Sequence, residues 1–249
     1  MSSDSLPLPK GAPMDVRRSP AESTTFLETL VDQQAFFPSD LPDPVRRLLE
    51  SGLEVFAERG YHAATTREIA ARAGMSPAAV YIHFQAKTDV LYELSQLGHL
   101  AVLGQLQAVA AGTPDPVQRI ERLVETFTTF HVQHHRMARV VQYEHRVLSG
   151  TQYESILQIR REIDAVIRQA VVDGMRAGVL QVEDVSGLVI AIAALSIDVV
   201  RWRDIGPPWS AERLARLNSR LVLSMLNAPD GGRPTSDAPV AGEPGPSST

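Results

Sequence analysis

The segment from residue 65 to residue 87 constrains this chain more than any other, because its residues predict two short helices joined by a tight turn. Thr65 and Glu68 have the spacing of a capping box, in which each side chain accepts a hydrogen bond from the backbone N–H of the other residue. Gly74 is placed to end the first helix, and Ser76 with the proline after it is placed to start the second. Such a pair makes a helix-turn-helix, whose second helix can enter the major groove of DNA.

The second of these helices has one face that can be buried and one that can meet a partner. Val80 and Phe84 lie one turn apart and form the buried stripe. The residues left toward the outside are Pro77, Ala78, Ala79, Tyr81 and His83. Ahead of them, residues 43–60 carry apolar side chains at helical spacing, and Gly60 is placed to end that helix. The three helices predict a small DNA-binding head that needs further helices to support it.

The rest of the chain predicts helices almost throughout. With 249 residues and 44% hydrophobic content, it can bury a substantial core. We expect helices at about 88–111, 117–135, 137–148, 153–177, 182–202 and 212–226, and one short helix at 24–37. Residues 188–195 are apolar nearly all round, which predicts burial on more than one face. The ends, 1–40 and 228–249, are expected to be a flexible extension and a disordered tail.

The head resembles that of tetracycline-repressor (TetR) type transcription regulators over the stretch FAERGYHAATTREIAARAGMSPAAVYIHFQAKTDVL. The positions that match the family pattern are Thr66, Ile69, Ala70, Ala73, Gly74, Met75, Ser76, Val80, Tyr81, His83, Phe84 and Lys87. Ala78 departs from the pattern, since glycine is frequent there, and we expect this change to alter base contacts rather than the fold. The resemblance covers about residues 41–91.

The resemblance implies an all-α protein with two domains. A three-helix DNA-binding head with the helix-turn-helix is expected at 41–88, and a helical ligand-binding and dimerisation domain at 89–227. A homodimer is then expected to bind a palindromic operator in double-stranded DNA. In the roles that the family gives to matching positions, Thr66, Arg67, Tyr81 and Lys87 bind phosphates, whereas Pro77, Ala78, Ala79 and His83 face bases. Because alanine and proline offer only apolar contacts, DNA shape is expected to carry much of the specificity.

The body resembles the members of this family that respond to acyl-CoA thioesters. The matching stretches are EHRVLSGTQYESILQIRREID at 144–164 and RWRDIGPPWSAERLARL at 201–217. The family resemblance implies that the last two long helices, at about 183–203 and 210–227, pair with their copies and that the middle helices enclose a pocket. The candidate effector contacts are Phe127, Arg139, Tyr143, Arg146, Arg160 and Trp202. Exposed helix charges and ordinary core packing are the alternative interpretations of these residues.

We therefore expect a repressor, without a cofactor, that a lipophilic small molecule such as an acyl-CoA thioester releases from its operator. The alternative is a DNA-binding activator or architectural protein without a small-molecule ligand. An enzyme is not expected, because no nucleophile–base or metal motif has a specific spacing. A helix-compatible group does occur at His131, His134, His135, Glu144 and His145. We interpret it as a polar helix end rather than a metal site.

Charge is the main objection to a DNA-binding role, because the chain has a net charge of −5 and DNA is an anion. The helix-turn-helix is locally basic, however, with Arg67, Arg72 and Lys87 set against Glu68 alone. The chain has no cysteine, which excludes disulfides and thiolate chemistry. No long apolar run predicts a membrane span, so we expect a cytoplasmic protein.

Overall fold

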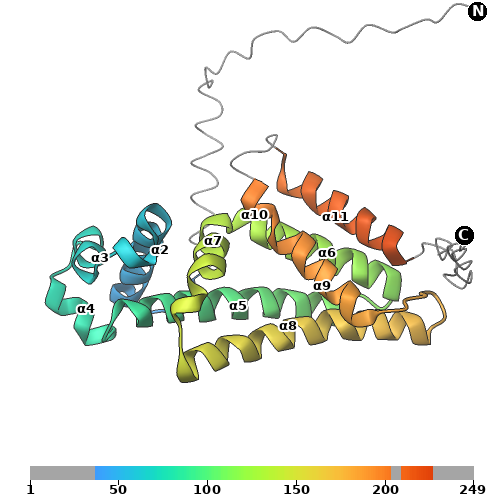
Figure 1. Cartoon of the computed structure of the whole chain (residues 1–249), viewed down its shortest axis with the longest axis horizontal. Coiled ribbons are helices and arrows are strands. Elements are labelled where there is room, and N and C mark those ends of the chain that lie inside the picture. Colours follow the sequence, from blue (N-terminus) through green and yellow to red (C-terminus); the bar gives the residue numbers. More distant parts are fainter. Residues whose placement is uncertain (1–36, 203–208, 227–249) are drawn as a thin grey trace, which may run out of the picture.

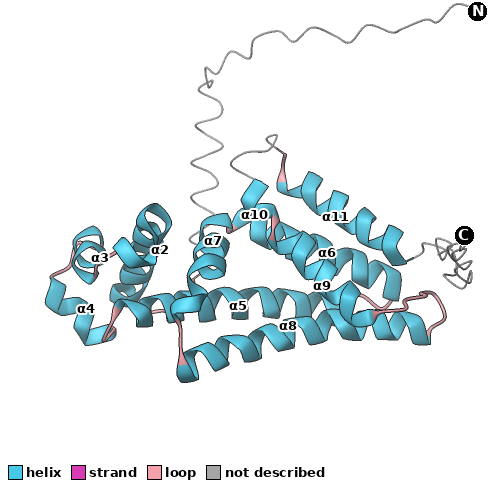
Figure 2. Cartoon of the chain, viewed as in Figure 1, coloured by secondary structure: helices cyan, strands magenta, loops and turns pink. Residues whose placement is uncertain are grey.

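All the secondary structure in the described residues is helical, as predicted (Figure 2). The computed structural model of the chain describes residues 37–202 and 209–226, except for the side chains of residues 143–145 and 202. The elements are α2 Asp43–Ala63, α3 Thr66–Arg72, α4 Pro77–His83, α5 Lys87–Gly112, α6 Pro116–Gln133, α7 His135–Glu144, the 3-10 turn η2 His145–Val147, α8 Gly150–Arg176, α9 Val185–Ile197, α10 Val199–Trp202 and α11 Ala211–Leu226. None of these helices is long and apolar enough to cross a membrane.

The head consists of α2, α3 and α4, at the left of Figure 1. The predicted capping box is present, since the Glu68 N–H donates to Thr65 Oγ1 (3.2 Å) and the Thr65 N–H donates to Glu68 Oε2 (3.0 Å). Gly74 makes the turn between α3 and α4 with a φ of 66°, a conformation that residues with a Cβ rarely adopt. Helical geometry in α2 breaks at Gly60, where φ is 73°. The local signals in the sequence therefore predicted the head correctly.

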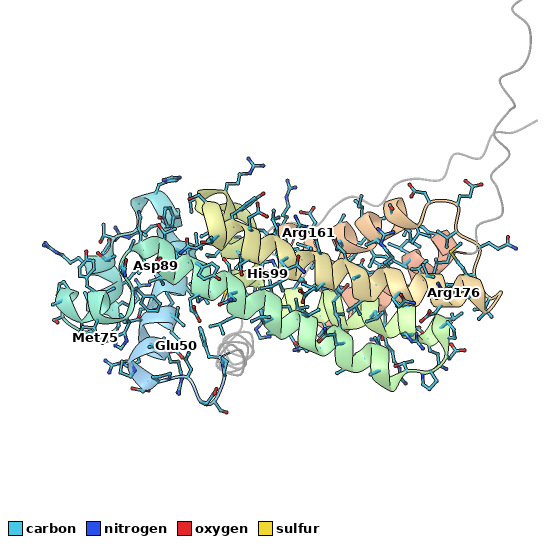
Figure 3. The ribbon with its side chains drawn as sticks, turned by 90° about the horizontal axis from the view of Figure 1, so that it is seen from below. Glu50, Met75, Asp89, His99, Arg161 and Arg176 are labelled. Atoms are coloured by element: carbon cyan, nitrogen blue, oxygen red, sulfur yellow. The ribbon has the colours of Figure 1, made fainter. Side chains whose placement is uncertain are left out.

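The body is built on α5 and α8, which lie side by side along most of their length (Figures 1 and 3). Helix α6 packs against both, and α9 and α11 pack against α6. The core between them contains Leu94, Leu106, Ile120, Ile156 and Ile167. Helix α5 starts in the head and continues into the body, so one uninterrupted helix joins the two parts.

A buried polar cluster fastens α9 and α11 to α6. The Asn218 amide donates to Thr128 Oγ1 (3.2 Å) and to the Leu195 carbonyl (2.9 Å). Thr128 Oγ1 also donates to Ser196 Oγ, at 3.4 Å. Because a buried polar group is costly when it has no partner, these bonds favour one arrangement of the three helices.

The predicted helix at 182–202 is two helices, because the chain makes a tighter turn at Asp198. There the Arg201 N–H donates to the Asp198 carbonyl three residues back (3.0 Å). The predicted burial of this segment on more than one face holds only in part within the protomer, because one stripe of α9 stays uncovered. Leu188 and Ile192 are buried, but Ile190 is 69% exposed.

Most of the predicted N-terminal extension and all of the predicted C-terminal tail lie outside the described residues. Residues 24–36 of the predicted short helix and the predicted tail at 228–249 lie outside the described residues. Phe37, at the end of the expected extension, is buried in the core. Helix α8 begins at Gly150, which has a φ of 55°, rather than at residue 153 as predicted.

Candidate DNA-binding surface and effector region

Helix α4 is anchored on one side and open on the other. Ser76 caps it by accepting from the Ala79 N–H (3.3 Å), and Pro77 occupies its first turn. Val80 and Phe84 are buried, as predicted. The residues that the sequence placed outside are exposed or half-buried: Pro77, Ala78, Ala79, Tyr81 and His83.

Ile82 also belongs to this open face, although it was not among the outward residues predicted from the sequence. It is 79% exposed, more than its neighbour Tyr81 at 57%. The signal was available, because Ile82 lies about 200° around the helix from the buried Val80. An isoleucine so exposed on the outer face of a short helix is a candidate for apolar contact with a partner.

Two of the expected phosphate contacts are brought together where α3 meets α4. Thr66 Oγ1 and the Tyr81 hydroxyl lie 3.2 Å apart, although 15 residues separate them in sequence. Arg67 follows Thr66 in the first turn of α3, is exposed, and has no ion pair or hydrogen bond among the described residues. Hydroxyls, a guanidinium and the start of a helix form the kind of surface that binds phosphate oxygens.

Arg72 does not add to the basic surface of the head. Its guanidinium makes a bidentate pair with Glu58, with N–O distances of 2.7 and 2.8 Å, and reaches Glu54 at 3.4 Å. The hydrogen bond from Arg72 holds the pKa of Glu58 below its ordinary value. This pair joins α3 to α2. The positive charge that the helix-turn-helix can offer to DNA is therefore smaller than its number of basic residues suggests.

Lys87 was expected to bind a DNA phosphate, but in the structure its side chain binds backbone carbonyls. Its ammonium donates to the carbonyls of Tyr61 (2.7 Å), His62 (3.2 Å) and Ala64 (2.8 Å), and lies 4.4 Å from the centre of the Tyr61 ring. An ammonium group has three N–H donors, so these carbonyls can occupy all of them. Lys87 thus ties the start of α5 to the end of α2, and a DNA phosphate would have to displace these carbonyls to bind it.

The candidate effector residues whose side chains are described do not lie together in one cluster. Arg139 is exposed and donates from Nη2 to the Ala57 carbonyl (3.2 Å), so it lies at the junction of α7 with the head rather than among the core residues of the body. Arg146 is exposed on η2, and Phe127 is buried in the core. The side chains of Tyr143 and Trp202 lie outside the described set.

Arg160 is the candidate that points into the body. It is half-buried on α8, and its Nε–H donates to His99 Nε2 on α5 at 2.9 Å. His99, which is buried and labelled in Figure 3, was not among the residues predicted from the sequence. Its pairing with Arg160 spans 61 residues, so no local pattern could reveal it.

His131 is a structural residue rather than part of a metal cluster. Its imidazole Nδ1–H donates to the Phe127 carbonyl (2.8 Å), and its ring lies 4.9 Å from the Phe127 ring. Burial lowers the pKa of His131 to about 4, so it is neutral at neutral pH. Within the described residues, no group of three histidine, aspartate or glutamate side chains could hold a metal ion.

Helices α9 and α11 present apolar side chains that the protomer does not cover. Ile190 on α9 is 69% exposed, and Leu221 and Met225 on α11 are each 44% exposed. Leu221 and Met225 are one turn apart and therefore share a face of α11. Neighbouring exposed apolar side chains such as Leu221 and Met225 mark a candidate surface for a partner.

Comparison with known proteins identifies the two parts of the chain. Residues 48–94 match the bacterial regulatory proteins of the tetR family, and residues 113–226 match the tetracyclin repressor-like C-terminal domain. The transcriptional activator FasR of Mycolicibacterium smegmatis is 30% identical over 170 residues, which are 65% of this chain and 74% of FasR. The transcriptional repressor KstR2 of Mycobacterium tuberculosis is 29% identical over 184 residues, which are 71% of this chain and 89% of KstR2.

Solved structures agree with these matches. A bacterial regulatory protein of the tetR family from Rhodococcus RHA1 has a TM-score of 0.70 and 37% identity, covering 74% of this chain and 96% of that one. The ketosteroid transcriptional regulator KstR2 of M. tuberculosis has a TM-score of 0.65 and 26% identity, covering 72% of this chain and 93% of that one. Proteins of this family are transcription regulators that bind operator DNA and dimerise, not enzymes. The chain belongs to the TetR family of transcription regulators.

Proposed function

We propose that this protein is a repressor that binds a palindromic operator as a homodimer, and that a lipophilic small molecule such as an acyl-CoA thioester releases it. The observation that carries the DNA-binding part is the open face of α4. Its outward side chains Ile82 and His83 are exposed and can enter a groove, while Val80 and Phe84 hold the helix against the head. A helix anchored in this way can lie in the major groove without disturbing the core.

Each residue of the surface then has a role that its chemistry supports. Thr66, Arg67 and Tyr81 bind phosphate oxygens and set the position of the head on the duplex. Pro77, Ala78, Ala79 and His83 face bases. Ile82 adds an apolar contact, for which the methyl group of thymine is the natural partner in the major groove.

Selection of DNA from a random pool by the full-length protein tests this proposal. We expect an inverted repeat whose half-sites are one helical turn, or a multiple of it, apart. Arg67→Ala should weaken binding to all sequences alike and reduce the slope of log K against log salt by about one. Ile82→Ala should instead alter the base preference at one position of each half-site. Recovery of no sequence above the random pool would count against the proposed role of α4.

The proposed dimer uses the uncovered apolar side chains of α9 and α11. Ile190, Leu221 and Met225 lie on the two helices whose equivalents are expected to pair between subunits. Burying them against their copies would remove apolar surface from water, at about 25 cal/mol per Å². Two heads held at a fixed separation would then match two half-sites of an operator.

The effector part of the proposal rests on the body. Its long apolar helices can enclose an acyl chain, and Arg160 supplies a cationic group inside them. KstR2, a relative, is described as a ketosteroid regulator, which supports a lipophilic ligand for this group of proteins. Titration of the operator complex with hexadecanoyl-CoA, hexadecanoic acid and free CoA tests this part. We expect the thioester to release the protein at lower concentration than the acid or CoA, and no release by any of them contradicts it.

One observation favours the alternative that the protein activates transcription. FasR, a relative at 30% identity, is named as an activator, whereas KstR2 is named as a repressor. A reporter gene behind the selected operator separates the two functions. Expression that falls when the protein is supplied supports the repressor, and expression that rises supports the activator.

A further inference from the structure

Arg160 is a half-buried cation whose hydrogen-bonding capacity is only partly used. The Nε–H donates to His99 Nε2, but Nη2 is buried and has no acceptor among the described residues. Arg160 has no ion pair in that part of the chain either. A buried guanidinium nitrogen without an acceptor is energetically unfavourable. A bound ligand with an acceptor oxygen would remove this cost.

A second partly buried arginine of the body shows the contrast. The Arg119 guanidinium pairs with Asp173 (3.0 Å), and its other two nitrogens donate to the Thr113 and Pro114 carbonyls (2.8 and 3.1 Å). Every nitrogen of Arg119 therefore has an acceptor supplied by the protein. Arg119 joins α6 to α8 as a structural residue, and Arg160 lacks the acceptors that such a role requires.

His99 holds the Arg160 side chain in a defined position. Because an arginine Nε–H can only donate, His99 Nε2 must be the unprotonated nitrogen of a neutral imidazole. The proton then lies on Nδ1, which donates to the Ser95 carbonyl one turn back on α5, at 2.7 Å. Both ring nitrogens of His99 are thus engaged, and the imidazole fixes the plane of the guanidinium.

Buried apolar side chains flank this pair on both helices. Ile156 and Ile163, one turn before and one turn after Arg160 on α8, are both buried. Val102, one turn after His99 on α5, is buried too. Figure 3 shows His99 on α5 where it runs beside α8. Burial lowers the pKa of Arg160, and the charges of Tyr153 and Asp164 oppose this effect.

We propose that Arg160, positioned by His99, is the receptor for an anionic oxygen of the effector, with the apolar chain of that molecule lying among the helices of the body. The inference rests on the proposed lipophilic effector and names the residue that recognises its acidic group. A carboxylate and a CoA phosphate both present such an oxygen to a guanidinium. Arg160 binds the effector, and His99 is a positioning residue that acts through Arg160.

The experiment measures direct binding of three probes to the full-length protein: hexadecanoic acid, hexadecanoyl-CoA and hexadecanol. Arg160→Gln should weaken binding of at least one anionic probe by about 10- to 100-fold, as for a lost charged hydrogen bond. Binding of hexadecanol should change less than threefold. A loss confined to the acid identifies a carboxylate as the ligand group, and a loss confined to the thioester identifies the CoA part.

Two further variants keep the test independent of folding. Arg161→Gln removes the exposed neighbouring arginine, labelled in Figure 3, and should leave all three affinities unchanged. His99→Leu removes the acceptor and should weaken the anionic probe, whereas His99→Gln keeps an acceptor and should restore part of that affinity. The thermal midpoint of Arg160→Gln and its operator affinity without a probe should match the wild type.

The experiment distinguishes a wrong effector class from a wrong role for Arg160. Wild-type protein that binds none of the three probes contradicts the lipophilic effector and this inference with it. Wild-type protein that binds the anionic probes, with Arg160→Gln binding them equally well, overturns the inference alone. An equal loss for hexadecanol also overturns it, because the side chain would then act through packing.

Discussion

The imidazole of His131 lies among the rings of Phe127 and Phe130, at centroid distances of 4.9 and 5.6 Å. Its Nδ1–H is bonded to a backbone carbonyl, and burial holds its pKa at about 4, against 6.5 for an ordinary histidine. Between these two pH values only the unfolded chain takes up a proton at this residue. The free energy of unfolding is therefore unaffected by His131 above pH 6.5 and falls as the pH is lowered through this window.

This linkage gives a prediction for stability. Between pH 7.5 and pH 5, His131 should account for about 2 kcal/mol of the loss in the free energy of unfolding. His131→Gln cannot titrate and should lose that part of the pH dependence, as measured by urea denaturation at the two pH values. His83→Gln, at an exposed position on α4, is the control and should keep the wild-type difference. Equal pH dependence in wild type and His131→Gln would show that His131 is accessible to protons in the folded state.

Lys87 leads to a second prediction at the same scale. Its ammonium binds three carbonyls at the end of α2, so Lys87→Ala should lower the free energy of unfolding by about 1–3 kcal/mol. The salt dependence of operator binding should stay close to that of the wild type. Arg67→Ala is the matched comparison, with the slope reduced and the stability unchanged. The reverse result for Lys87→Ala, a flatter slope with unchanged stability, would assign Lys87 to a DNA phosphate.

At the scale of single elements, the sequence predicted best where the signal is local. The boundaries around α3 and α4 depend on a capping box, a glycine and a serine–proline pair, all within 13 residues. The buried faces of these helices also follow from spacing alone. The start of α6 was predicted in the same way, since Asp115 accepts from the Gln118 N–H (2.7 Å) ahead of Pro116.

What the sequence could not predict depends on contacts between distant residues. Arg72 looked available for DNA because its partner Glu58 lies on another helix, 14 residues away. Arg139 looked like an effector contact, and its partner Ala57 lies 82 residues away. In α9 the sequence is apolar nearly all round, and no periodicity distinguishes the face that packs in the protomer from the face that remains uncovered.

The uncovered face of α9 can be tested directly. Ile190→Glu should convert the dimer to folded monomers, because a charge would be buried in the proposed interface. Sedimentation and circular dichroism measure the mass and the helix content. Arg161→Glu on α8 should remain dimeric.

Leu188→Glu should affect folding, whereas Ile190→Glu should affect only dimerisation. Leu188 is 9% exposed and packs in the core of its own protomer, so this variant should unfold rather than dissociate. A dimeric, operator-binding Ile190→Glu protein would move the interface away from α9.

At the scale of the whole molecule, the head touches the body at few places. Helix α7 packs against α2 and against α5, and Arg139 bonds to the α2 backbone at Ala57. At the other side, Gln152 at the start of α8 donates to Asp89 in the first turn of α5 (2.9 Å). A change of the body that reaches DNA must pass through contacts such as these.

Arg139→Ala should therefore weaken the communication between the two parts while leaving each part intact. We expect operator and hexadecanoyl-CoA to bind the variant separately within about threefold of wild type. The factor by which the thioester lowers operator affinity should fall by about fivefold, which is about 1 kcal/mol of coupling. Arg161→Ala, at an exposed position on α8, serves as the control. An unchanged coupling factor would place the communication elsewhere, with the α8–α5 contact next to be tested.

Helix α5 makes small changes in the body matter to the head. Its 26 residues give a rod about 39 Å long, from Lys87 beside the DNA-binding helices to Gly112 at the far end of the body. Pivoted at that far end, a tilt of about 5° would carry the other end through about 3 Å. A hydrogen bond loses its geometry over a few tenths of an ångström. The molecule can thus act as a lever, in which a shift no larger than ordinary side-chain repacking decides whether two heads still fit their half-sites.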